Sequence, residues 1–257
     1  MAWFLGIDIG SSTSKGVITG DGELKFYHML GSGVNYGDTA RKLMEELLTQ
    51  GGLRTEDITR TVTTGRGAGV IPFESLQVPD IQCCARGIHH IFPSVRTVID
   101  VQGQSTQIIQ VDEKGQVRNF AVSEACASAS GCFIDVIANV LQIELKDIGP
   151  LSLKSKTPVT FATGCAVFGE SEAISRVSEG VPVEDILAGV HQALAMKISA
   201  LVERVGLEEP CAITGGGGLN TGLINKLEEM GIELLVPPQP QFVNALGAAI
   251  MAEERVR

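Results

Sequence analysis

Two similar strand–loop–strand segments constrain the fold of this chain most. Residues 7–14 align with residues 99–106 at an offset of 92 positions, and the strands that follow the two segments stay in register. In each copy an aspartate, Asp8 or Asp100, lies in an apolar strand just before a polar loop. Two such units can face each other across a cleft and grip one polyphosphate with its metal ion. The repeat therefore predicts an internal duplication built around a nucleotide.

The first of the two loops has the composition of a phosphate-binding turn. Gly10 permits close approach of the backbone, the hydroxyl-bearing residues 11–14 supply donors, and Lys15 supplies a positive charge. Asp8 could hold Mg²⁺ through water, as carboxylates beside phosphates often do. Taken alone, the segment is equally well explained as an ordinary serine-rich hairpin turn. Its repetition favours the phosphate-binding interpretation.

A glycine-rich turn lies between another apolar strand and a helix. The strand is predicted at residues 211–214, four glycines follow at 215–218, and the helix is predicted at residues 223–230. Glycines at such a place let the backbone lie against a nucleobase or against phosphates. A glycine-rich turn alone does not identify a ligand. After two phosphate-type loops it supports a nucleotide site, because such a site needs both a phosphate grip and a platform for the base.

Two cysteines stand near the starts of predicted helices. Cys126 precedes a helical pattern that begins at Phe133, and Cys165 directly precedes a second pattern. The free N–H groups and the positive dipole end of a helix N-terminus stabilise a thiolate, which is the form that ligates metal. Two such positions predict a shared ligand. The six cysteines of the chain do not form a small disulfide framework, so a reducing compartment and metal or redox chemistry are expected.

Two other groups of side chains have competing explanations. Cys83, Cys84, His89 and His90 share one predicted helix and could in principle bind metal. Adjacent pairs point in different directions around a helix, which favours core thiols and surface imidazoles. Arg66 lies in a short glycine-flanked loop after a strand and could reach a phosphate. An exposed loop arginine is the favoured interpretation there.

Helical periodicity also defines the scaffold. Apolar residues recur at helical spacing in residues 38–50, 80–91 and 183–205, and a helix rich in alanine closes the chain at residues 242–253. The longest of these patterns, at 183–205, stops at Gly206 and is interpreted as scaffold.

The composition argues against several kinds of partner. The chain has 257 residues, of which 44% are hydrophobic, and its 30 acidic and 20 basic residues give a net charge of −10. This charge disfavours binding to nucleic acid or to an anionic membrane. The N-terminal segment lacks the basic region and long apolar core of a signal peptide, and no run of about 18 apolar residues follows. We therefore expect a cytoplasmic protein with no nucleic-acid and no membrane partner.

The order of the motifs resembles that of a known superfamily. Residues 8–15 (DIGSSTSK), 100–104 (DVQGQ) and 214–218 (TGGGG) resemble the two phosphate motifs and the adenosine motif of the acetate kinase, sugar kinase, Hsp70 and actin superfamily. Within it, the turn headed by Cys126 and residues 165–172 (CAVFGESE) are similar to the ATP-dependent activators of 2-hydroxyacyl-CoA dehydratases and to the ATPase subunits of benzoyl-CoA reductase.

This resemblance covers nearly the whole chain and implies a fold. The expected class is α/β, with a duplicated actin-like (ribonuclease H-like) ATPase fold in which two lobes surround a nucleotide cleft. The first lobe would comprise residues 1–96 with 243–257. The second lobe, residues 97–242, would carry the cluster cysteines.

The activity that the resemblance implies is ATP-driven electron transfer. An oxygen-sensitive homodimer of an anaerobic organism would share one [4Fe-4S] cluster, with Cys126 and Cys165 of each subunit completing a four-cysteine ligand set. The electron would come from ferredoxin or flavodoxin and pass, with ATP hydrolysis, to an iron–sulfur acceptor protein. That acceptor would be a 2-hydroxyacyl-CoA dehydratase, a benzoyl-CoA reductase or a double-cubane-cluster protein.

The nucleotide-site residues are assigned on the same resemblance. Asp8 and Asp100 would position Mg²⁺ and water, and Gln104 would orient the attacking water. The other candidates would bind ATP or ADP: Ser11, Ser12, Thr13, Lys15 and Gly103 at the phosphates, and Gly215, Gly216 and Gly217 at the adenosine.

The chain departs from the family pattern at two places. In the second loop Gln102, Ser105 and Gln107 stand where relatives usually have a glycine, an acid and a lysine, and this could slow hydrolysis. Cys132 is an extra thiol close in sequence to Cys126. It is expected to pack inside the helix, although it could exchange as a cluster ligand.

Two other functions remain compatible with the sequence. A small-molecule kinase of the same superfamily would need a substrate pocket with its own catalytic base, for which this short chain leaves little room. A non-catalytic nucleotide-gated scaffold with merely buried cysteines would fit the altered second loop. Iron content and phosphate transfer distinguish these functions from electron donation.

Overall fold

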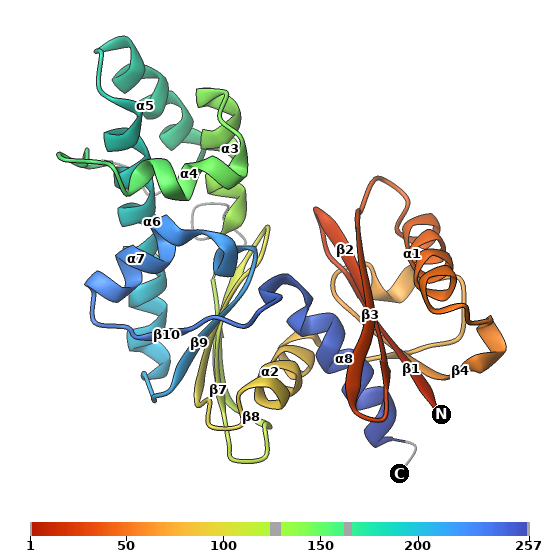
Figure 1. The fold of residues 1–257 in the computed structure, drawn as a ribbon. Coiled ribbons are helices and arrows are strands. Elements are labelled where there is room, and N and C mark those ends of the chain that lie inside the picture. Colours follow the sequence, from red (N-terminus) through yellow and green to blue (C-terminus); the bar gives the residue numbers. More distant parts are fainter. Residues whose placement is uncertain (1, 124–129, 162–165, 256–257) are drawn as a thin grey trace. The chain divides into compact units, whose positions relative to one another are not determined.

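A computed structural model describes residues 2–123, 130–161 and 166–255 of the chain. The chain divides into two compact units (Figure 1). Unit 1 comprises Met1–Val95, Val111–Arg118 and Gln241–Arg257, and unit 2 comprises Arg96–Gln110 and Asn119–Pro240.

Unit 1 contains a five-stranded mixed sheet. Its strands are β1 (Trp3–Ile9), β2 (Thr13–Gly20), β3 (Glu23–Gly31), β4 (Ile58–Thr64) and β5 (Leu76–Gln77), in the order β3-β2-β1-β4-β5. The central strand β1 pairs antiparallel with β2 and parallel with β4. Strand β2 begins at Thr13, inside the hydroxyl-bearing residues 11–14 that were assigned to the polar loop, and β3 was not predicted. The first polar loop is therefore shorter than the sequence indicated.

Helices cover both faces of this sheet (Figure 1). Alternate side chains of β1, such as Leu5 and Ile7, pack with the apolar face of α1 (Tyr36–Gly51). Phe4, on the other face of β1, packs with α2 (Asp80–Ile91) and α8 (Val243–Glu254). The period of two along the central strand thus buries it on both sides. Short 3₁₀ turns lie at Thr55–Asp57 and Ala68–Val70.

Glycines allow β1, α8 and α2 to pack backbone against backbone. A Cβ atom added at Gly6 would overlap the Ala245 carbonyl oxygen, and one added at Gly247 would overlap the Cys83 carbonyl oxygen. The predicted helices at 80–91 and 242–253 are confirmed, the second with bounds shifted by one residue. Their close contact explains why α8 is rich in small residues.

Gly247→Ala is expected to lower the free energy of unfolding by at least about 3 kcal/mol, because the new methyl group would meet backbone atoms that cannot move independently. Urea denaturation of the wild type and the variant measures this change. The control is Gly31→Ala, where a Cβ would have no atom within 4 Å, and it should stay within about 1 kcal/mol of the wild type. Equal loss in the two variants would contradict the close packing of α8 on α2.

A second five-stranded sheet, most of which lies in unit 2, repeats the sheet of unit 1. Its strands are β6 (Thr97–Val101), β7 (Thr106–Val111), β8 (Val117–Val122), β9 (Cys211–Gly215) and β10 (Leu234–Leu235), in the order β10-β9-β6-β7-β8. The central strand β6 pairs antiparallel with β7 and parallel with β9, as β1 does with β2 and β4. Asp100 lies opposite Gln107 just as Asp8 lies opposite Lys15. This common topology and register confirm the internal duplication.

The described helices of unit 2 are α3 (Gly131–Leu141), α4 (Leu145–Ser152), α5 (Ala166–Ser178), α6 (Val183–Val205) and α7 (Thr221–Glu229), with a 3₁₀ turn at Gly216–Leu219. A further 3₁₀ turn, Pro240–Phe242, leads toward α8. Helix α4, which contains Pro150, was not predicted.

Helix α6 has the predicted span and contributes to the core of this unit. By length and composition it could cross a membrane, with a mean hydropathy of 1.3 over its most apolar window, but 56% of that window is buried inside the protein. Residues such as Ile186, Leu194 and Ile198 belong to the core cluster of the unit. This burial is the pattern of a core helix, as the scaffold interpretation requires.

Candidate functional site

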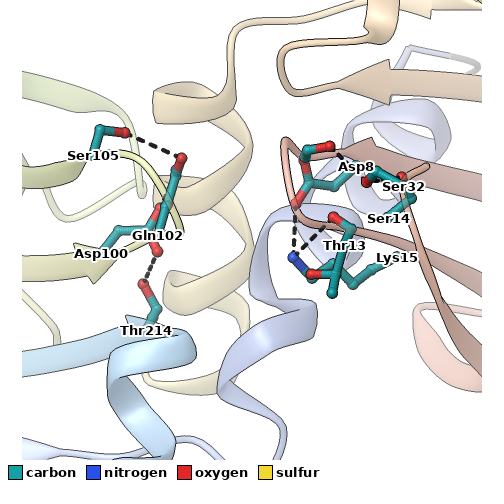
Figure 2. Close-up of polar contacts among 10 residues, drawn as sticks. Asp8, Thr13, Ser14, Lys15, Ser32, Asp100, Gln102, Ser105 and Thr214 are labelled. Carbon is teal, nitrogen blue, oxygen red and sulfur yellow. Dashed lines mark hydrogen bonds and ion pairs between the residues drawn. The ribbon is translucent and has the colours of Figure 1, made fainter. Parts of the chain in front are cut away.

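The first polar loop holds a carboxylate and an ammonium group near each other. Asp8, close to the end of β1, is 7% exposed and lies opposite Lys15 of β2. The Lys15 Nζ atom is 4.0 Å from Asp8 Oδ2 and donates a hydrogen bond of 3.3 Å to the Thr13 carbonyl oxygen (Figure 2). A Cβ atom at Gly10 would lie 2.6 Å from the same carbonyl. The loop is therefore tightly turned around a lysine that is partly neutralised by Asp8.

Ser32 supports this loop and was missed by the sequence analysis. Its hydroxyl donates to the Gly10 carbonyl oxygen at 2.7 Å, and its N–H donates to the Ser12 carbonyl oxygen at 3.0 Å. The buried Ser14 hydroxyl lies 2.8 Å from the Ser32 hydroxyl (Figure 2). The Ser14 hydroxyl therefore faces the protein interior. Ser12 is exposed, and Ser11 and Thr13 are partly exposed. Ser32 follows β3, and no local pattern connects it with residues 10–14.

The second loop holds its aspartate by neutral donors. Asp100 is 1% exposed, and its two carboxylate oxygens accept hydrogen bonds from Thr214 at 2.9 Å and from the Gln102 amide at 2.7 Å. The Ser105 hydroxyl donates to the Gln102 side-chain oxygen at 3.4 Å (Figure 2). Two of the residues that depart from the family pattern therefore form a chain of contacts that ends on Asp100. Gln104 is exposed beside them.

The same loop caps the start of α3. The N–H of Gly131 donates to the Gln102 carbonyl oxygen, and the N–H of Cys132 donates to the Gly103 carbonyl oxygen, both at 2.8 Å. These two N–H groups belong to the first turn of the helix, where no intrahelical acceptor exists. A shift of the loop must therefore move or uncap the N-terminus of α3.

The glycine-rich turn has a structural explanation beside the predicted contact with adenosine. Gly215 has φ +72°, and a Cβ there would lie 2.8 Å from a carboxylate oxygen of Asp100. A Cβ at Gly217 would overlap the Val101 side chain, whereas Gly216 is exposed. Two of the three glycines are thus required by packing against β6. Adenosine binding by all three stays a prediction.

Cys126 and Cys165 lie outside the described residues, but the helices that follow them in sequence pack together. Helix α3 begins shortly after Cys126 and α5 directly after Cys165, and a Cβ at Gly169 of α5 would lie 2.7 Å from the ring of Phe133 of α3. Cys132 lies within α3, as expected, and is half-buried. The helices that follow the two cysteines therefore contact each other, and a shared ligand of Cys126 and Cys165 stays a prediction.

Asp185 of α6 fixes the segment that leads to Cys165. Its Oδ1 atom accepts hydrogen bonds from the Ser155 hydroxyl at 2.6 Å and from the N–H groups of Lys156 and Thr157 at 3.1 and 3.0 Å. The Ser155 bond, followed by that of Thr157, lowers the pKa of this carboxyl below its usual value. The charged acceptor therefore anchors this segment on α6.

The cysteines and histidines of α2 do not gather into a metal site. Cys83 and Cys84 are buried, while His89 is half-buried and His90 is exposed, as the favoured interpretation predicted. Burial raises the pKa of the Cys83 thiol to about 12, so it stays protonated. No group of three or more potential ligands from His, Cys, Asp and Glu occurs within the described ranges.

A duplicated mixed sheet with a buried aspartate beside a polar loop in each copy defines an actin-like nucleotide-binding fold. The chain belongs to the BadF/BadG/BcrA/BcrD ATPase family, whose profile matches residues 5–252. The resemblance that the motifs indicated is thereby confirmed.

The curated relatives include activators of enzymes that act on CoA thioesters. The chain is 36% identical over 255 residues to the 2-hydroxyisocaproyl-CoA dehydratase activator of Clostridioides difficile, covering 98% of this chain and 96% of the relative. It is 37% identical over 254 residues to the (R)-2-hydroxyglutaryl-CoA dehydratase activating ATPase of Acidaminococcus fermentans, covering 98% and 97%. It is 31% identical over 259 residues to one of the subunits of benzoyl-CoA reductase from Thauera aromatica, covering 95% and 91%.

Two solved structures share the fold over nearly their full length. Component A of the Acidaminococcus fermentans (R)-2-hydroxyglutaryl-CoA dehydratase superposes with a TM-score of 0.93 at 36% identity, covering 99% of each chain. The activator of the 2-hydroxyisocaproyl-CoA dehydratase from Clostridium difficile, with bound ADPNP, gives the same TM-score and identity and covers 98% of this chain and 95% of its own. The predicted duplicated actin-like α/β fold is therefore correct.

Proposed function

We propose that this protein is an ATP-hydrolysing iron–sulfur electron donor that activates or reduces a partner iron–sulfur enzyme. One observation carries the proposal: the second polar loop caps α3, the helix that follows Cys126. Any nucleotide-dependent change in residues 102–103 therefore acts directly on the N-terminus of that helix. The names of the relatives, which are activators and a component of a reductase, support the same function.

In this proposal the nucleotide is bound by the two polar loops and the glycine-rich turn. Asp8 and Asp100 position Mg²⁺ and water, and Gln104 orients the attacking water. The phosphates of ATP or ADP bind to Ser11, Ser12, Thr13, Lys15 and Gly103, and the adenosine lies against Gly215, Gly216 and Gly217. The buried Asp8 carboxylate and the exposure of Ser12 and Gln104 fit these roles. The Gln102 amide and the Thr214 hydroxyl hold Asp100 in one orientation.

The redox part of the proposal rests on Cys126 and Cys165. Two thiolates per chain complete the cysteine set of one [4Fe-4S] cluster in a homodimer, and such a cluster supplies a single low-potential electron when bound. The packing of α3 on α5 supports a shared ligand for the two thiolates. Ferredoxin or flavodoxin reduces the protein in the cytoplasm of an anaerobic cell. The acceptor is an enzyme of the dehydratase, benzoyl-CoA reductase or double-cubane type.

The first test of this function is the iron and sulfide content of protein purified without oxygen, measured together with its mass in solution and its ATP turnover. We expect about four irons per dimer and measurable hydrolysis of ATP. Protein that binds ATP but holds no iron after anaerobic reconstitution would instead support a nucleotide-gated scaffold. Transfer of phosphate from ATP to a sugar or a carboxylic acid would support a kinase.

A further inference from the structure

The internal duplication includes a pair of loops that the sequence analysis did not align. Strand β4 ends at Thr64, which lies opposite Asp8 in a parallel pair, and Thr214 of β9 lies opposite Asp100 in the same way. Each threonine is followed by a glycine with positive φ, +85° at Gly65 and +72° at Gly215. The loop that follows β4 is therefore the counterpart in unit 1 of the glycine-rich turn in unit 2.

The two loops also make the same close contacts with their central strands. A Cβ at Gly65 would overlap a carboxylate oxygen of Asp8, just as one at Gly215 would crowd Asp100. A second pair of glycines makes equivalent contacts with the residues that follow the two aspartates. A Cβ at Gly67 would overlap the Ile9 side chain, and one at Gly217 would overlap the Val101 side chain. Equal glycine spacing, equal register and equal neighbours show that the two loops are equivalent in structure.

The residue between the two glycines is where the loops differ. Unit 2 has Gly216 there and unit 1 has Arg66, and both positions are exposed. The exposure of Arg66 agrees with the interpretation favoured by the sequence. Its position, however, is directly after the glycine that touches the Asp8 carboxylate. The backbone of Arg66, from which its positively charged side chain extends, is therefore next to the first polar loop.

Some other surface arginines of this acidic chain form ion pairs, unlike Arg66. Arg41 pairs with Asp38 at 3.1 Å and Arg176 pairs with Glu179 at 3.1 Å. Arg66 forms no ion pair or hydrogen bond with any residue in the described part of the chain. Lys15, the other cation of this loop region, is partly neutralised by Asp8. Arg66 therefore keeps its full donor set available for an anion.

We propose that Arg66 is a further phosphate-binding residue, which donates its guanidinium N–H groups to the polyphosphate of the nucleotide. This inference rests on the proposed function, because it requires that ATP binds at the loop of residues 10–15. A planar guanidinium fits two phosphate oxygens at once and stays charged at every physiological pH. Thr64 to Gly67 is then a ligand loop of unit 1, as residues 214–217 are proposed to be in unit 2.

The test compares the affinities of the anaerobically purified protein and its variants for ATP and for adenosine by titration calorimetry. Arg66→Gln should weaken ATP binding at least about tenfold, because it removes a hydrogen bond between charged groups, and should leave adenosine binding unchanged. Arg66→Lys keeps the positive charge but not the planar guanidinium, so its affinity for ATP should lie between those of the wild type and Arg66→Gln. Arg41→Gln is the matched control, since it also removes one exposed arginine of unit 1.

Each outcome of this test separates the inference from the proposed function. A wild-type protein that does not bind ATP contradicts the proposed function itself. A wild type that binds ATP, with Arg66→Gln within twofold of it, overturns the role of Arg66 and leaves the proposed function intact. An equal loss of ATP and adenosine binding in Arg66→Gln also overturns the role. A residue that contacts only the phosphates should not change the affinity for adenosine, which carries none. An equal loss of ATP binding in Arg41→Gln does the same, because it reveals a general effect of net charge.

Discussion

Asp8→Asn is expected to lower ATP turnover by about a hundredfold or more while the protein keeps its fold and its iron. The substitution preserves the size of the side chain but removes the negative charge proposed to position Mg²⁺ and water. It also removes the ion-pair partner of Lys15, which lies 4.0 Å away. Steady-state phosphate release measures turnover, and iron content measured on the same sample reports on the cluster. Wild-type turnover in this variant would exclude Asp8 from the mechanism.

Asp21→Asn is the matched control for this experiment. Asp21 is an exposed aspartate in the turn between β2 and β3, and its φ of +54° is one that asparagine adopts readily. The control makes the same chemical change in the same sheet of unit 1 but away from the polar loop. It should leave turnover within about twofold of the wild type, since exposed substitutions far from special features have small effects. Equal loss in the two variants would indicate a general effect of charge.

Cys165→Ala is expected to abolish cluster binding while nucleotide affinity stays unchanged. Loss of one thiolate per chain removes half of the proposed four-cysteine set in the dimer. Iron and sulfide analysis after anaerobic reconstitution measures the first effect, and titration with ATP measures the second. Full iron content in this variant would remove Cys165 from the ligand set.

Cys132→Ala provides the comparison for the cluster experiment. Cys132 is half-buried in the first turn of α3, and its N–H is bonded to the Gly103 carbonyl oxygen. This backbone bond does not depend on the thiol, so the variant should bind the normal amount of iron. Loss of iron here, combined with retention in Cys165→Ala, would show that Cys132 is the ligand.

Local patterns were sufficient for much of the fold. The helices at 80–91 and 183–205 have the predicted bounds, because their apolar stripes recur at helical spacing over several turns. The duplication was visible because each aspartate keeps the same distance from the strand that follows. The short helix α4 and the strand β3 were missed. Pro150 inside α4 and the lack of a fully buried face on β3 weaken the signals on which sequence analysis depends.

The candidate site was only partly predictable for a related reason. The sequence indicated Asp8, Asp100 and the polar loops that follow them. It did not reveal that Ser32 supports the first loop, nor that Thr214 and Gln102 hold Asp100. These contacts join segments whose separation in the chain carries no periodic signal. The glycines at 215 and 217 were assigned to a ligand, and the structure adds a packing reason that composition alone cannot distinguish from it.

Neighbouring residues alone were enough to predict the repeated strand–loop–strand unit, the two cysteines that precede helices, and the main helices. The folded chain was needed to show that Thr64 lies beside Asp8 as Thr214 lies beside Asp100, and that the second loop caps α3. Parallel strands are joined by long connections, so the register between them is set by packing of the whole unit and not by any local pattern.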